Sequence, residues 1–181
     1  MTARGWLRFL FLLVLTAVVQ EGILNGIVVG GAHPDAFLLV ATVAGLTAGA
    51  QQGAVLAFVT GLVADLFLPT SYGFSAFCFV LVAFAVGLAA GVQGGRVPYG
   101  FRVVAAVVGS VGGSLLFAGL QTLLGQPHLG PRAILLVCAV VATGNAVLAI
   151  PATALVQRAV TAGRSGQRGL ASVAGGSATV R

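Results

Sequence analysis

Charged residues are scarce in this sequence, and their scarcity determines the class of protein. The chain has 181 residues, of which 7% are charged and 59% are hydrophobic. Soluble globular domains carry roughly 25% charged residues, so the surface of this chain must face lipid or other helices instead of water. Repeated apolar runs of about 18 residues or more are typical of transmembrane helices. The composition therefore excludes a soluble domain and predicts an integral membrane protein.

The residue patterns typical of catalysis, metal binding or nucleic-acid binding are also missing. Lysine is absent, and the nine basic residues are arginines scattered singly between apolar runs, which argues against binding of nucleic acid. Cys78 and Cys138 each lie inside an apolar run, as small buried residues do, and not in a metal-ligand spacing. His33 and His128 fall in predicted loops, and neither a Walker loop nor an HExxH pattern is present. We expect no enzyme, no cofactor and no metal site.

What the sequence does contain is a series of six apolar runs, separated by segments rich in glycine, proline and polar residues. They cover residues 6–24, 36–50, 54–68, 74–92, 101–124 and 133–156. The second and third would form about 22 Å of helix each, against a hydrocarbon core of about 30 Å, so they are either two short spans or a re-entrant hairpin. The predicted fold is an all-α bundle of about six transmembrane helices over residues 1–160. Residues 161–181 show no apolar periodicity and are expected to be a disordered tail.

The arginines predict the orientation of the bundle. With six crossings and the N-terminus inside, one outer loop holds Arg132, and all other arginines fall in inner segments: Arg4, Arg8, Arg96, Arg102, Arg158, Arg164, Arg168 and Arg181. Basic residues concentrate on the cytoplasmic side of membrane proteins. The chain is therefore expected in a bacterial inner membrane, with both termini, and with them the tail, in the cytoplasm.

The three acidic residues all fall near the predicted outer face, and each has two interpretations. Asp65 lies in an otherwise apolar helix, where a carboxylate is costly, so it either serves a partner or points to water at the interface. Its expected internal counter-charge is Arg132. Asp35 is suited to cap the second helix, and Glu21 is expected to be hydrated.

Small residues recur at four-residue spacing and favour close packing of helices. This pattern permits membrane helices to approach closely. It includes Gly45, Gly49, Gly53, Ala57, Gly61, Gly87, Gly91, Gly109 and Gly113.

Several short motifs resemble a known family. Pro34 and Asp35 precede the second apolar run, and the third contains Gly61 and Asp65 in a Gly-Leu-x-x-Asp pattern. Gly73 ends the next loop, preceded here by Tyr where the family shows Leu. Over residues 30 to 90 the chain resembles the rod shape-determining protein MreD family. Over the rest of the chain, the resemblance rests on the length and on the number of predicted helices, which are similar to those of the family.

The resemblance implies a non-enzymatic scaffold of the cell-elongation complex that helps to position lateral peptidoglycan synthesis. The partners it implies are a periplasmic MreC-like protein, an MreB-like actin homologue, a RodA-like glycosyltransferase and a class B penicillin-binding protein. The family's fold is also similar to that of the substrate-binding subunits of energy-coupling-factor transporters. That similarity supplies an alternative, a small-molecule-binding membrane subunit. The few polar residues in the predicted outer loops, and the lack of an Ala-x-x-x-Ala pattern in the first run, argue against it.

Overall fold

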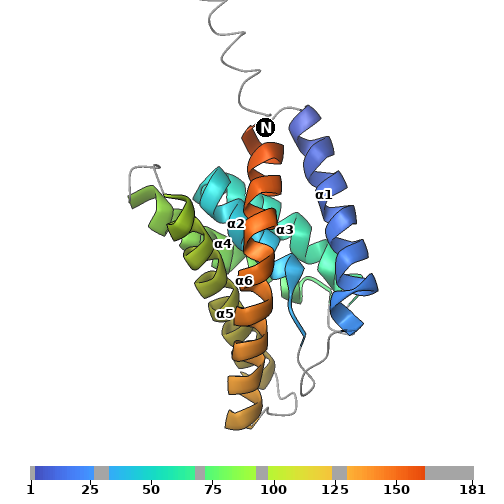
Figure 1. Ribbon diagram of the computed structural model, residues 1–181, viewed down its shortest axis with the longest axis vertical. Helices are drawn as coiled ribbons and strands as arrows, with labels where there is room; N and C mark the ends of the chain where they lie inside the picture. The colour runs from blue at the N-terminus through green and yellow to red at the C-terminus, as the bar shows by residue number, and fades with distance from the viewer. Residues whose placement is uncertain (1–2, 27–32, 68–71, 93–97, 124–129, 162–181) are drawn as a thin grey trace, which may run out of the picture.

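The described part of the protein is a bundle of six α-helices, as predicted from the apolar runs (Figure 1). The structure is a computed structural model that describes residues 3–26, 33–67, 72–92, 98–123 and 130–161. The helices are α1 (Ala3–Gly22), α2 (Ala36–Ala48), α3 (Ala50–Asp65), α4 (Phe74–Val92), α5 (Tyr99–Leu123) and α6 (Pro131–Thr161), and a 3-10 turn, η1 (Leu24–Gly26), follows α1. Of the predicted tail, residues 162–181 lie outside the described part.

Four helical segments of the described chain are long and apolar enough to cross a membrane. They are Ala3–Gly26, Phe74–Gly91, Gly100–Leu123 and Ile134–Val160. Helix α2 has 13 residues and α3 has 16, or about 20 and 24 Å at 1.5 Å per residue, both shorter than the hydrocarbon core. The pair therefore has the short helices that the sequence predicted for two short spans or a re-entrant hairpin.

Helices α2 and α3 form a hairpin in the centre of the bundle. Gly49 joins them with a φ of 85°, which favours glycine because it lacks a Cβ. Every residue of α2 except Thr47 is buried, and α2 contacts all five other helices. A helix that is apolar on all sides is suited to such a position. The core is therefore built around α2.

Glycine contacts hold the hairpin and α4 at close distance, as the small-residue spacing predicted. A Cβ placed on Gly87 would lie 2.6 Å from the Ala50 Cα, and one on Gly53 would lie 2.5 Å from the Gly45 Cα. Gly91, from the same pattern, has nothing within 4 Å. Backbone contacts this short cannot accept a larger side chain without moving a helix.

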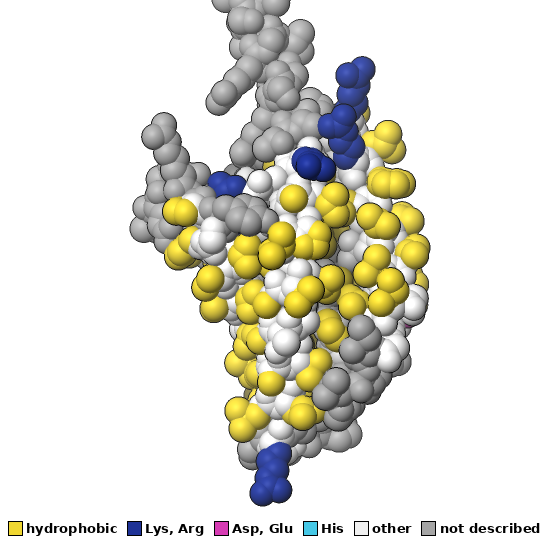
Figure 2. Space-filling model, in the orientation of Figure 1, with side chains coloured by type: hydrophobic (Ala, Val, Ile, Leu, Met, Phe, Trp, Pro, Cys, Tyr) yellow, Lys and Arg dark blue, Asp and Glu magenta, His cyan; other side chains and the backbone are white. Residues whose placement is uncertain are grey.

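The helices alternate in direction, so the charged residues separate toward two ends (Figure 1). We call one the acidic end, because Glu21, Asp35 and Asp65 lie there, at the end of α1, the start of α2 and the end of α3. Arg132, in the first turn of α6, also lies there. The opposite, basic end has four described arginines: Arg4, Arg8, Arg102 and Arg158. Figure 2 shows arginine side chains at both ends and hydrophobic side chains along the length between them.

Candidate functional site

Asp65 is buried at the acidic end and caps helix α4. Its side chain is 1% exposed, and its Oδ2 and Oδ1 accept hydrogen bonds from the backbone N–H groups of Gly73 (2.7 Å) and Ser75 (3.1 Å). Gly73 has a φ of 91°, a conformation that glycine adopts easily. A carboxylate at a helix N-terminus satisfies free N–H groups and interacts favourably with the helix dipole. The burial of this charge is therefore compensated inside the chain.

Gly61 makes that contact possible one helical turn earlier on α3. A Cβ at this position would lie 2.6 Å from the Ala76 nitrogen, and closer still to the Ala76 Cα. The backbone of α3 therefore touches the first turn of α4, which places Asp65 within reach of its two N–H donors. The three motif residues Gly61, Asp65 and Gly73 form one structural unit, which the sequence motif did not reveal.

The expected ion pair between Asp65 and Arg132 is not formed in the described part of the chain. Asp65 is buried and its carboxylate oxygens accept from backbone N–H groups. Arg132 is exposed in the first turn of α6. The helix N-terminus of α4 takes the role that we had expected of the arginine.

Asp35 caps helix α2, as its position before an apolar run predicted. Its Oδ1 accepts from the Leu38 N–H at 2.9 Å, with extended backbone angles at Asp35 itself. Burial raises the pKa of the Asp35 carboxyl above its usual value, while the Leu38 N–H and the nearby His33 act in the opposite direction. Pro34 is buried against α6, where a Cβ on Gly144 would lie 2.5 Å from its Cγ.

Gln20 joins the ends of α1 and α2 in a buried polar network. Its Oε1 accepts from the Ala36 N–H at 2.9 Å, and its Nε2 donates to the Pro34 carbonyl at 3.1 Å and to Asn25 Oδ1 at 3.0 Å. On α6, Asn145 donates to the Asp35 carbonyl at 3.2 Å. No sequence motif identified Gln20 or Asn145 as site residues. Their one signal was an amide side chain within an apolar run.

Glu21 lies at the rim of this network. It is exposed, and it accepts a hydrogen bond from Asn25 Nδ2 at 2.8 Å. Beside it is an open cavity of ≈ 220 Å³, with Gln20, Glu21, Asn25, His33, Asp35, Phe37, Ala64 and Phe67 in its lining. Two capping carboxylates, a buried amide and a partly polar cavity therefore lie together at the acidic end.

The helix lengths and the uses of these polar groups define a class of protein, a multi-pass helical membrane protein with helix ends fastened by side-chain caps. A family model described as rod shape-determining protein MreD matches residues 3–125, which include α1 to α5. This chain belongs to the MreD family, as its motifs predicted. No curated protein and no solved structure gives a significant match. The similarity to energy-coupling-factor subunits stays a prediction.

Proposed function

We propose that this chain is a non-enzymatic membrane scaffold of the cell-elongation machinery that helps to position lateral peptidoglycan synthesis. Membership of a family named for rod shape determination connects it with that process. The observation that carries the scaffold role is the use of its buried polar groups. Asp65, Asp35 and Gln20 bind backbone groups that hold helix ends together. Polar groups used in this way are suited to maintaining one fixed surface for partners.

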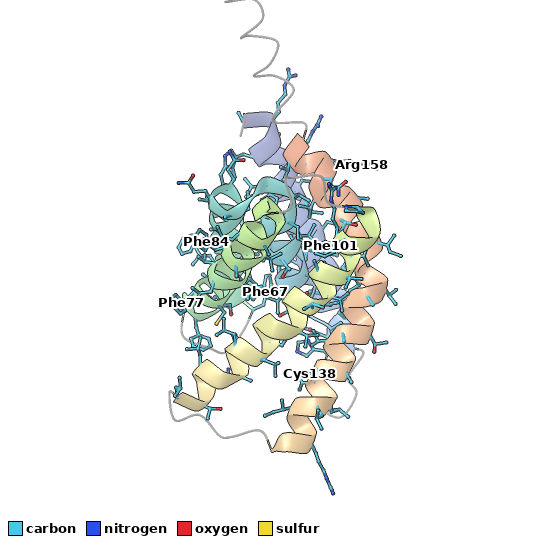
Figure 3. The ribbon with its side chains drawn as sticks, turned by 90° about the vertical axis from the view of Figure 1, so that its left-hand side faces the viewer. Phe67, Phe77, Phe84, Phe101, Cys138 and Arg158 are labelled. Atoms are coloured by element: carbon cyan, nitrogen blue, oxygen red, sulfur yellow. The ribbon has the colours of Figure 1, made fainter. Side chains whose placement is uncertain are left out.

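The proposed partners are those that the family resemblance implies: an MreC-like protein, an MreB-like actin homologue, a RodA-like glycosyltransferase and a class B penicillin-binding protein. Those that cross the bilayer would contact the lateral apolar surface of the bundle. One continuous part of that surface is the outer side of α4, where Phe77 and Phe84 are 54% and 43% exposed at a spacing of two helical turns. Figure 3 shows both rings projecting from α4.

Photo-crosslinking from native membranes tests the scaffold. A benzoylphenylalanine at one exposed apolar position of each of five helices samples the perimeter: Phe11, Phe58, Phe84, Val108 and Val147. We expect elongation-complex proteins to crosslink from one face, with no adduct from the opposite face. Unirradiated cells serve as the control. Absence of such adducts at all five positions, with normal amounts of the protein in the membrane, would refute the proposal.

For the orientation, we propose that the basic end faces the cytoplasm of a bacterial inner membrane, with both termini inside. The distribution of the described arginines supports it, with four at the basic end and Arg132 alone at the acidic end. Cytoplasmic reporters fused after Arg102 and Thr161 should be active, and a periplasmic reporter at Gly130 should be active as well. Activity of a periplasmic reporter fused after Thr161 would contradict this orientation.

A second candidate function is supported by the cavity at the acidic end. Its lining combines amide, carboxylate and imidazole groups with two phenylalanine rings, a mixture suited to a small polar molecule. Mass spectrometry of protein purified from native membranes would detect such a ligand. Copurification of one compound in stoichiometric amount, lost in a Gln20→Leu variant, would favour the small-molecule-binding subunit over the scaffold.

A further inference from the structure

A narrow apolar groove lies between α1 and α6 on the lateral surface of the bundle. It encloses ≈ 160 Å³, and α2 contributes Leu39 and Val40 to its lining. Its one polar lining residue, Thr16, donates its hydroxyl to the Leu12 carbonyl at 2.8 Å. The groove therefore offers an occupant apolar surface.

The size of the groove fits an alkyl chain better than a helix. A dry apolar cavity of about 150 Å³ in another protein holds one benzene-sized molecule. An α-helix with its side chains is about 10–12 Å across. A segment of one acyl chain fits into this volume, and a partner helix could only cover it from outside.

Arginines extend both walls of the groove toward the basic end. Arg8 precedes Leu12 and Leu15 by four and seven residues on α1, and Arg158 follows Leu155 and Pro151 by three and seven residues on α6. Residues at these spacings share one face of a helix. Both arginines are exposed, and Figure 3 shows Arg158 near the end of α6. Figure 2 shows arginine side chains gathered where α1 begins and α6 ends.

The depths of the two walls agree with one leaflet of a bilayer. At 1.5 Å per residue, Leu12 to Val19 lie about 6 to 16 Å from Arg8 along α1, and Leu155 to Leu148 lie about 4 to 15 Å from Arg158 along α6. Half of the hydrocarbon core is about 15 Å. Trp6 lines a cavity beside Gln51 and Gln52 at the same end, and tryptophan is enriched at the membrane interface. In a bilayer whose interface lies at Trp6, the two arginines would be at headgroup level and the groove at acyl-chain level.

The basic end carries positive charge that an external anion can neutralise. The chain has three acidic side chains in all, and these lie at the acidic end, so none can neutralise Arg8 or Arg158. Arginine binds phosphate through two parallel hydrogen bonds. We infer that one anionic glycerophospholipid binds here, with an acyl chain in the groove and its phosphate between Arg8 and Arg158.

Native mass spectrometry of the full chain in detergent tests the headgroup contact. Dioleoylphosphatidylglycerol and dioleoylphosphatidylcholine serve as probes with identical acyl chains, and we expect one phosphatidylglycerol molecule to bind in preference. Arg8→Gln and Arg158→Gln should each weaken its binding about five-fold, the effect of one basic residue near an anionic lipid surface. The matched control is Arg132→Gln at the acidic end, which should leave binding unchanged. An equal loss in the control would reduce the effect to net charge and overturn the site.

Filling the groove tests the acyl-chain contact separately. Ala152→Leu in the groove and Leu155→Trp at its exposed edge should each weaken phosphatidylglycerol binding several-fold, since the larger side chain takes the space of the acyl chain and removes its packing contacts with the groove walls. Val147→Leu, on an exposed part of α6 outside the groove, should have no effect. If both filling variants stay folded and bind phosphatidylglycerol normally, the groove is not the site. If they abolish a protein crosslink and leave lipid binding intact, a partner helix covers the groove and the inference fails.

Discussion

Replacement of Asp65 by alanine should lower the free energy of unfolding by about 2–4 kcal/mol. The substitution removes the cap of α4. It leaves the half-buried N–H group of Gly73 and the buried N–H group of Ser75 without an acceptor, each at a cost of about 1–3 kcal/mol. Thermal unfolding of purified protein in detergent should show a fall in Tm of several degrees. Membrane abundance should fall in parallel.

Two further variants separate capping from the other roles considered for Asp65. Asp65→Asn keeps one acceptor oxygen and should recover about half of the lost stability. Glu21→Gln, at an exposed carboxylate of the same end, should change the stability by less than about 0.5 kcal/mol. If Arg132→Ala matched Asp65→Ala, an ion pair would replace the cap as the explanation. Unchanged stability together with loss of the MreC-like partner would instead assign Asp65 to partner binding.

Replacement of Gly61 by alanine should be nearly as damaging, although it adds one methyl group. The new Cβ would meet backbone atoms of Ala76, 2.6 Å from its nitrogen, and backbone cannot rotate away as a side chain can. Overpacking of this kind costs about 1–3 kcal/mol, and here it also moves Asp65 away from its donors. We expect a loss of about 3 kcal/mol, measured by the same unfolding assay.

Gly91→Ala is the matched control for Gly61→Ala. Gly91 belongs to the same small-residue pattern, yet nothing lies within 4 Å of a Cβ placed there. Alanine has the higher helix propensity, so this variant should be neutral or slightly stabilising. Equal losses in the two variants would show that the loss at Gly61 does not come from the close contact between α3 and α4. The double variant Gly61→Ala with Asp65→Ala should lose less stability than the sum of the two single losses, because Gly61 and Asp65 act in one contact.

The sequence alone predicted the helices because their signal is local. In a chain with 7% charged residues, the long apolar runs lie in lipid, where their backbone N–H and C=O groups must bond to each other within helices. The run predicted at 74–92 has the same bounds as α4, whereas α6 extends about five residues beyond its predicted end. The Asp35 cap could also be predicted, since a cap depends on residues next to it in sequence. The motif around Asp65 identified the family because its residues also lie close together in the sequence.

The tertiary structure decided which residues each polar group binds. In a chain where both lipid-facing and core-facing residues are apolar, periodicity cannot distinguish the two faces, so the central position of α2 was not predictable. Opposite charge suggested Arg132 as the counter-charge of Asp65, but the close contact at Gly61 brings the start of α4 there first. The groove between α1 and α6 likewise exists only after two helices distant in sequence pack together. Composition and local pattern thus determined the membrane class and the helices, and the packing of helix ends determined the site, because those contacts join residues that no local pattern connects.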